Sequence, residues 1–227
     1  MTPWPVRYRR GSAGDLHQWS AAQVSSGAPL GRAVWVMVPS APSLVLGSTQ
    51  RDEVADPGAC LCAGVALVRR RSGGGAVLVG PGEQIWVDVV LPRGDPLWSD
   101  DVGRATWWVG EAWAAALSAL GVPAPTVWKG GLVRTEWSEL VCFAGRGPGE
   151  VLSATGAKLV GISQRRSRTG AVFQTSCLLR WSPGALTALL ALPGPDRERA
   201  TRELEHLAEG VDVPGGRLLD AFVASLP

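Results

Sequence analysis

Arg69-Arg70-Arg71-Ser72-Gly73-Gly74-Gly75-Ala76-Val77-Leu78-Val79 is the stretch around which the chain is organised. Apolar residues lead into it at 65–68 and out of it at 76–79, which predicts two strands joined by a glycine turn. Three consecutive glycines carry no Cβ, so a ligand can lie directly on the backbone, and successive N–H groups can form an anion-binding concavity. A flexible hairpin loop with a solvated basic rim is the alternative interpretation. The turn is not a P-loop, because no Gly-Lys-Ser/Thr follows and a strand comes next.

The composition indicates a soluble chain with enough apolar residues for a sizeable core. Its 227 residues are 46% hydrophobic and carry a net charge of +2, which argues against nucleic-acid or membrane partners. No apolar run reaches the roughly 18 residues that a membrane helix needs, and residues 1–5 lack a signal-peptide layout. We therefore expect a cytoplasmic protein whose cysteines are reduced, namely Cys60, Cys62, Cys142 and Cys177.

Histidine and lysine are both scarce. The two histidines, His17 and His206, lie near opposite ends of the chain, so we predict neither a histidine metal site nor a Ser-His-Asp triad. Of the 22 basic residues only Lys129 and Lys158 are lysines. Lys158 lies in an apolar strand pattern, where the bias towards arginine makes a lysine informative. Arginine cannot replace it where a compact point charge is required. The alternative is a lysine at a strand end that reaches solvent.

The order of the expected elements predicts an α+β fold with a mixed sheet and flanking helices. Helices are expected at 12–24, 100–120, 183–192, 196–208 and 216–225. Besides the strands around the glycine turn, strands are expected at 34–38, 44–46, 85–91, 126–129, 140–143, 150–153, 158–163, 171–174 and 177–180. The strand at 85–91 is almost continuously apolar, which indicates burial on both faces apart from Asp88. No repeat or linker is visible, so we expect residues 1–227 to form one domain.

Three motifs give the chain a family resemblance. The segment 69–77 resembles the Arg-Arg-x-Ser-Gly-Gly-Gly-Ala-Val signature of lipoate-protein ligases, octanoyltransferases and biotin-protein ligases. Gly156-Ala157-Lys158-Leu159-Val160-Gly161-Ile162-Ser163-Gln164-Arg165-Arg166 resembles the family segment that carries the catalytic lysine. A weaker echo is Leu46-Gly47-Ser48-Thr49-Gln50. The motifs lie in family order, and the resemblance covers about residues 30–180.

The resemblance implies an enzyme, most simply a lipoate-protein ligase. It would use ATP, with Mg²⁺, to convert lipoate or octanoate into the acyl-adenylate, and would pass the acyl group to a lysine of a lipoyl carrier domain. That carrier would be a 2-oxoacid dehydrogenase subunit or the glycine cleavage H protein. Lys158 would contact the acyl carbonyl and stabilise the developing oxyanion. The implied binding residues are Arg70, Arg71, Ser72, Gly73, Gly74, Gly75, Ala76, Gly161 and Ser163, with the arginines of 165–168 as further candidates for anionic groups.

Two alternatives stay open. Val141-Cys142-Phe143 matches the Cys-Phe of one class of octanoyltransferase, in which the cysteine takes octanoate from acyl carrier protein as a thioester. A non-catalytic relative that binds an acyl group or a nucleotide is the second alternative. A buried structural cysteine explains Cys142 without any chemistry.

The chain also departs from the family pattern. Many ligases have His-Asp where this chain has Val79-Gly80, and His-Gly where it has Thr175-Ser176. The full-length ligases carry an accessory domain after the catalytic one. Fewer than 50 residues follow Arg180 here, so we expect the catalytic domain alone, and a separate accessory subunit is one candidate partner beside acyl carrier protein.

Overall fold

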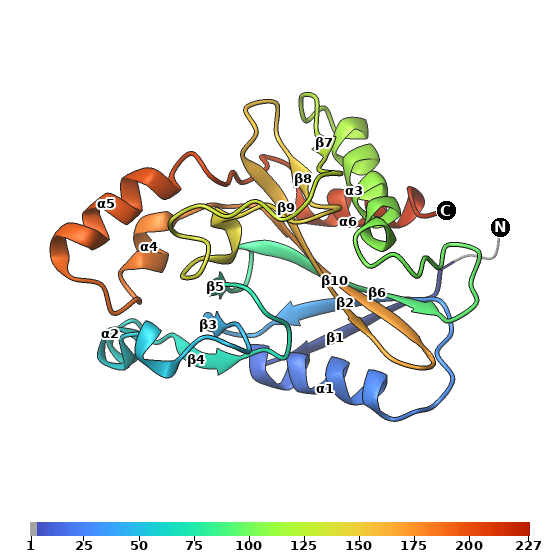
Figure 1. The fold of residues 1–227 in the computed structure, drawn as a ribbon, viewed down its shortest axis with the longest axis horizontal. Helices are drawn as coiled ribbons and strands as arrows, with labels where there is room; N and C mark the ends of the chain where they lie inside the picture. Colours follow the sequence, from blue (N-terminus) through green and yellow to red (C-terminus); the bar gives the residue numbers. More distant parts are fainter. Residues whose placement is uncertain (1–3) are drawn as a thin grey trace.

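A computed structural model of the chain describes residues 4–227 and contains a large mixed sheet of seven strands (Figure 1). Their spatial order is β1-β2-β6-β10-β9-β8-β7, and β1 and β2 are parallel while the other neighbours are antiparallel. The strands are β1 (Val6–Gly11), β2 (Ala33–Pro39), β6 (Gln84–Pro92), β7 (Thr126–Val127), β8 (Val151–Leu152), β9 (Lys158–Arg166) and β10 (Gly170–Leu178).

A second, smaller sheet carries the glycine turn. It has the order β4-β3-β5, with β3 (Ser43–Leu46) parallel to β4 (Ala66–Arg69) and antiparallel to β5 (Val77–Val79). The turn therefore leaves the edge strand β4, passes the end of β3 and returns on the other side as β5. The predicted strand–glycine–strand unit is present, although its two strands flank β3 and do not pair as a hairpin.

Successive side chains along the central strands point to opposite faces of the large sheet, and an apolar core lies on each face. Val34 and Val36 of β2 pack into a core with α3 (Trp107–Ala119) and α6 (Gly215–Ala224). Trp35 and Met37 point to the other face, against α1 (Ala13–Ser25) and the small sheet. Strand β6 is likewise buried on both faces, which its continuous hydrophobicity predicted.

Shorter helices complete the chain. They are α2 (Pro57–Cys62), α4 (Pro183–Thr187) and α5 (Gly194–Leu204), with single 3₁₀ turns η1 (Asp52–Val54), η2 (Arg104–Thr106) and η3 (Cys142–Ala144). A third core joins α4 and α5 to the small sheet through Leu44, Leu186 and Leu204. No helix within residues 4–227 is both long enough and apolar enough to cross a membrane.

Several local predictions were wrong. Residues 140–143 form no strand, because Val141 donates to the Trp137 carbonyl and Cys142 opens a 3₁₀ turn. The two short strands predicted at 171–174 and 177–180 are one strand, β10, which pairs on both sides through its polar centre. Strand β1 was not predicted, since its exposed, arginine-rich sequence lacks an apolar pattern. The helix predicted at 100–120 begins only at Trp107, after η2, and that predicted at 183–192 ends at Thr187.

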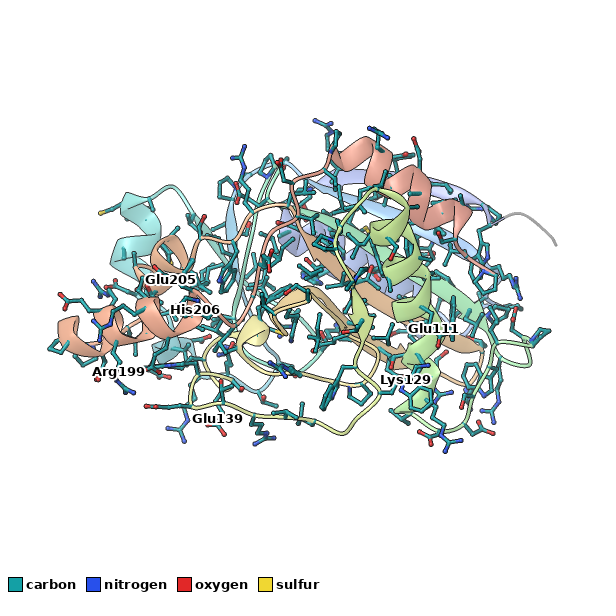
Figure 2. All side chains as sticks on the ribbon, turned by 90° about the horizontal axis from the view of Figure 1, so that it is seen from above. Glu111, Lys129, Glu139, Arg199, Glu205 and His206 are labelled. Carbon is teal, nitrogen blue, oxygen red and sulfur yellow. The ribbon has the colours of Figure 1, made fainter. Side chains whose placement is uncertain are left out.

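The surface ion pairs include the first of the two lysines. Lys129 contacts Glu111 of α3 at 2.7 Å, and both side chains are about half exposed (Figure 2). Arg199 of α5 binds Glu136 through two hydrogen bonds and ties α5 to the loop before η3. Such exposed pairs contribute little to stability.

Candidate functional site

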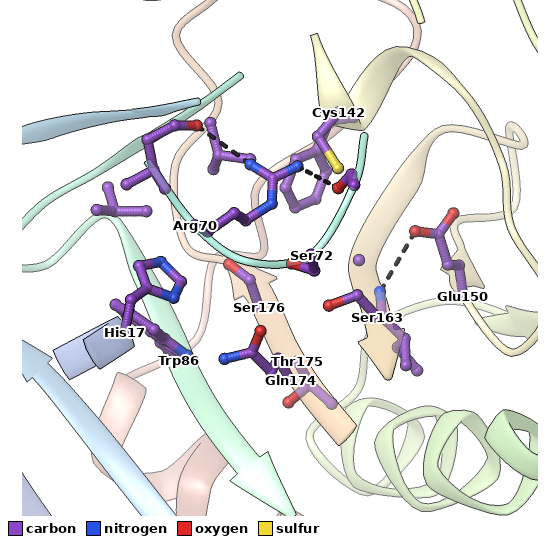
Figure 3. Close-up of a pocket in the computed structure, with 17 residues that line it drawn as sticks. His17, Arg70, Ser72, Trp86, Cys142, Glu150, Ser163, Gln174, Thr175 and Ser176 are labelled. Carbon is purple, nitrogen blue, oxygen red and sulfur yellow. Dashed lines mark hydrogen bonds between the residues drawn. The ribbon is translucent and has the colours of Figure 1, made fainter. Parts of the chain in front are cut away.

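Arg70 holds the glycine loop in shape from within. Its buried guanidinium donates to the carbonyl oxygens of Val45 at 3.1 Å, Gly73 at 2.7 Å and Gly75 at 2.8 Å (Figure 3 shows the first two). A planar guanidinium with five donors suits this task, because it can serve several carbonyls at once. Arg70 is thus committed to backbone carbonyls, and its first role is to organise the loop.

The glycines of the loop differ in what surrounds them. A Cβ on Gly75 would lie 2.5 Å from the backbone nitrogen of Val141, and one on Gly74 would lie 3.3 Å from the sulfur of Cys142, with φ at +92°. A Cβ on Gly47, from the third motif, would meet the carbonyl oxygen of Gly74 at 1.8 Å. Gly73 has open space around it. Close backbone approach therefore requires Gly47 and Gly75, whereas Gly73 faces a void.

The loop is joined to the segment that carries Cys142. Ala76 donates to the carbonyl of Leu140 at 2.7 Å and accepts from the amide of Cys142 at 3.0 Å, which forms a short parallel bridge. Gln50 adds a second link, since its side-chain amide donates to the carbonyls of Glu139 and Leu140 while its oxygen accepts from Gly47. The third motif also contacts the first directly, since the amide of Ser48 donates to the carbonyl of Ser72 at 2.9 Å.

Lys158, at the start of β9, is one of the largest fully buried side chains. Its ammonium contacts a carboxylate oxygen of Glu150 at 2.7 Å and donates to the carbonyl of Cys142 at 3.0 Å. It lies 5.4 Å from the ring centroid of Phe143. The contacts with Glu150 and Cys142 engage two of the three ammonium protons, which leaves one N–H for a ligand. The lysine does not reach solvent at a strand end, and that alternative is wrong.

Two adjoining cavities surround these residues. We call the one between the two sheets, with a volume of about 90 Å³, the sheet cavity. The other, with a volume of about 620 Å³, is bounded by the glycine loop, the 132–147 segment and Lys158, and we call it the lysine cavity. They share five lining residues: Gly73, Cys142, Glu150, Ile162 and Ser163. A ligand with an elongated tail and a polar head can extend through both.

Polar side chains support the wall of the sheet cavity. Asp88 is buried behind the wall and accepts hydrogen bonds from Ser20, from the Trp86 indole at 2.8 Å and from the Gln174 amide at 3.2 Å. Burial raises the pKa of Asp88 to about 6, although these hydrogen bonds oppose the shift. Trp86 and Gln174 line the cavity, so Asp88 fixes the orientation of two wall residues.

His17 reaches the same wall from α1. Its ring lies 4.4 Å from that of Trp86, centroid to centroid (Figure 3). Burial, together with the nearby charge of Arg70, lowers the pKa of His17 to about 4, so the imidazole is neutral at pH 7. The position of His17 near the start of the sequence did not indicate that it would line this cavity.

The structure brings most of the predicted site residues together. The sheet cavity includes Arg70, Ser72 and Gly161, the lysine cavity includes Gly74, Gly75 and Lys158, and Gly73, Cys142 and Ser163 line both. Ala76 lines neither, because it is buried in the bridge to Val141. Arg71 also lines neither of them, and contributes instead to an adjacent recess with His17 and Arg165.

The arginines of 165–168 do not gather around the lysine cavity. Arg165 donates to Ser25 of α1, and Arg166 donates to the carbonyl of Ser99 and stacks on Trp98 at 4.2 Å. The arginines that do line the lysine cavity are Arg134 and Arg146, which the sequence did not single out. Glu150, Trp86, Gln174 and His17 were also missed.

Comparisons with known proteins agree with this arrangement. A family model described as "Lipoyl protein ligase A/B catalytic domain" matches residues 15–212. No curated protein sequence matches significantly.

Solved structures match the whole fold at low sequence identity. A bipartite lipoate protein ligase from Thermoplasma acidophilum, solved in a study that included its E2 lipoyl domain, has a TM-score of 0.77 at 17% identity, over 99% of this chain and 82% of that one. A lipoate-protein ligase A bound with ATP has a TM-score of 0.73 at 18% identity, over 99% and 84%. A second T. acidophilum structure, with bound lipoic acid, has a TM-score of 0.71 at 15% identity, over 99% and 84%.

Proposed function

The chain belongs to the lipoyl protein ligase A/B catalytic-domain family, and on that premise we propose that it activates lipoate or octanoate with ATP and transfers the acyl group to a lysine of a lipoyl carrier domain. The observation that carries the proposal is the buried ammonium of Lys158, which lines the lysine cavity beside the glycine loop. A positive point charge in a cavity wall suits a reaction in which a carboxylate is activated and its carbonyl later attacked.

The two cavities suit the two parts of the acyl-adenylate. The sheet cavity, walled by Val45, Val77, Trp86 and Ile162 among others, would hold the acyl tail. The lysine cavity would hold the adenylate. The amides of Gly73, Gly74 and Gly75 make no hydrogen bond within residues 4–227, so they are available to phosphate oxygens, with Arg134 and Arg146 nearby.

The chemistry then runs in two steps. A carboxylate oxygen of the acid attacks the α-phosphorus of ATP, and pyrophosphate leaves. The amine of the carrier lysine attacks the carbonyl carbon of the resulting adenylate, AMP leaves, and the amine gives up a proton. The remaining N–H of Lys158 would donate to the carbonyl oxygen as it becomes negative, and losing such a donor costs roughly 10²–10³ in rate.

Magnesium would enter with the phosphates of ATP. Among residues 4–227, no group of three or more His, Cys, Asp or Glu side chains is placed to hold a metal ion. The carboxylate closest to the lysine, Glu150, is already engaged by Lys158 and two backbone amides. The ion would therefore neutralise phosphate charge without a protein cage, as Mg²⁺ often does.

A lipoyl carrier domain is the proposed partner. The study of the T. acidophilum ligase included an E2 lipoyl domain, which supports a carrier of that type here. The same relative is described as bipartite, which supports a separate accessory subunit as a second proposed partner. A location in the cytoplasm, where ATP is available, is part of the proposal.

The position of Cys142 supports a second candidate function. Its side chain lines both cavities, and its own carbonyl accepts from Lys158. In an octanoyltransferase the Cys142 thiolate would attack the thioester carbonyl of octanoyl acyl carrier protein, release the thiol of acyl carrier protein and form an acyl-cysteine. The lysine of the lipoyl carrier domain would then take the acyl group from Cys142.

An ATP–pyrophosphate exchange assay tests the ligase. Exchange that depends on lipoate or octanoate is the expected result. Intact-mass analysis after incubation with octanoyl acyl carrier protein tests the second candidate, since only a transferase gains the octanoyl mass. A protein that does neither but melts at higher temperature with lipoate would be the non-catalytic relative, and would overturn both enzyme proposals.

A further inference from the structure

Glu150 is buried and fully engaged at the junction of the two cavities. One carboxylate oxygen accepts from the amide of Gly147 at 2.6 Å and contacts the ammonium of Lys158 at 2.7 Å, and the other accepts from the amide of Ile162 at 3.3 Å (Figure 3 shows the last). The side chains of Lys158 and Glu150 are 2% and 6% exposed. Three donors from three places along the chain therefore fix this carboxylate.

Stability is a poor explanation for such a pair. Removing two charges from water is costly, and apolar residues of similar volume often serve a core equally well. The chain avoids lysine almost everywhere, with two among 22 basic residues, yet buries one of them against a carboxylate. The pair is therefore better explained by a need for a charged ammonium at the wall of the lysine cavity than by packing.

The geometry shows what the carboxylate does to the ammonium. Glu150 and the carbonyl of Cys142 engage two of its protons from fixed positions, so the direction of the third N–H is determined. Without the carboxylate, the four-carbon stem of lysine has freedom to move the charge, and a misplacement of about 1 Å can cost roughly a hundredfold in rate. The negative charge at 2.7 Å also weakens the attraction of the ammonium for an anionic ligand.

We propose that Glu150 is a positioning residue for the reaction: it aims the ammonium of Lys158 at the acyl carbonyl, at the expense of affinity for the anionic substrate. The kinetic consequences of this inference rest on the proposed function. The claim that Glu150 fixes the position of the Lys158 ammonium does not depend on activity. It predicts that removing the charge of Glu150 moves turnover and substrate affinity in opposite directions. A merely structural residue would lower the folded fraction and leave both constants of the folded enzyme unchanged.

The first experiment observes the ammonium itself. Because the chain has two lysines, ¹⁵N-lysine labelling gives two side-chain ammonium signals in an NMR spectrum. We expect one that exchanges slowly with water and disappears in Lys158→Arg. Glu150→Gln, which keeps the size of the side chain, should shift this signal or broaden it beyond detection. The matched control is Glu111→Gln, which removes the carboxylate from the exposed pair with Lys129, also at 2.7 Å, and should leave the slow signal unchanged.

The second experiment measures kcat and the Kd for the free acid in the same variants. In Glu150→Gln we expect kcat to fall at least about tenfold while the Kd for lipoate or octanoate decreases. Glu150→Asp should recover part of the lost kcat, and Glu111→Gln should match the wild type. Circular dichroism and the melting temperature establish that each variant is folded.

The outcomes separate this inference from the proposed function. An unchanged slow ammonium signal in Glu150→Gln overturns the inference, as does an unchanged kcat in a folded variant. A wild type that is inactive in every assay overturns the proposed function, and the NMR comparison then decides the role of Glu150 alone.

Discussion

The guanidinium of Arg70 donates to the carbonyl oxygen of Gly75, 2.8 Å away, across the loop that lies between them. The sequence presents this arginine as a ligand for anions, whereas its hydrogen bonds hold the glycine loop in its bent form. Anion binding by the loop, as proposed, would then depend on backbone amides whose positions Arg70 fixes.

Replacing Arg70 with lysine should therefore cost stability. A lysine ammonium cannot serve three carbonyls in the same geometry, and buried carbonyls lose their partners, so we expect a loss of about 2–4 kcal/mol in the free energy of unfolding. Urea denaturation measures it. Arg71→Lys is the control, since Arg71 is exposed and should change by less than about 0.5 kcal/mol. A stable Arg70→Lys protein that binds ATP poorly would instead restore the anion-binding role.

The glycines predict two different phenotypes within one loop. A methyl group on Gly75 would press on the backbone of Val141, so Gly75→Ala should destabilise the protein by about 1–3 kcal/mol. Gly73→Ala has open space and should fold normally, yet its methyl group lies where both cavities meet and should weaken ligand binding. Melting curves with and without lipoate separate the two effects. Equal melting temperatures and equal shifts with lipoate in the two variants would contradict these separate roles for Gly73 and Gly75.

Cys142→Ser distinguishes the two enzyme proposals. A ligase activates the acid as an adenylate and needs no covalent intermediate, so we expect acyl transfer within a few-fold of the wild type. In a transferase the same change replaces the thiolate with a far weaker nucleophile, and activity should fall by orders of magnitude. Acyl transfer to a lipoyl domain is the measurement, with circular dichroism to establish folding. A collapse of transfer in a folded variant would favour the transferase.

His17 and Asp88 should make opposite contributions to the pH dependence of stability. Asp88 has a folded-state pKa of about 6 against an ordinary 3.8, so its contribution is present below pH 3.8 and is lost as pH rises through 6. His17 has a folded-state pKa of about 4 against 6.5, so its contribution is present above pH 6.5 and is lost as pH falls through 4. The two slopes largely cancel between pH 4 and 6.5.

Single substitutions should expose each slope. In His17→Gln the free energy of unfolding should decrease between pH 4 and 6, because the Asp88 contribution is no longer opposed. In Asp88→Asn it should increase over that range. Urea denaturation at several pH values gives both slopes, and identical profiles in the two variants would show that neither group titrates as its burial implies.

The parts of the site that the sequence predicted are those written in short, contiguous motifs. Strand–glycine–strand, the Lys158 segment and the mixed sheet follow from local patterns, and the structure confirms the fold that they imply. His17 was missed, because it reaches the site through Trp86, far along the chain. Glu150 was missed although Gly147, Lys158 and Ile162 lie close to it in sequence, because no motif marks the turn that brings them together. Strand β1 was missed since its side chains are mostly charged and its pairing with β2 supplies the strand. Strand β10 was predicted as two short strands, because its central residues are polar. Those residues line the sheet cavity, which explains why they are not apolar.

The boundary between the sheet cavity and the lysine cavity has an evolutionary consequence. Among residues 4–227 only five line both, so most of the wall around the proposed acyl tail is encoded separately from the wall around the proposed reacting carbonyl. If the proposed function holds, mutations in His17, Trp86 or Ser176 would alter which tail is accepted without changing the residues around Lys158. A scaffold divided in this way would allow new acyl specificities to arise by gradual drift while the proposed reaction is kept.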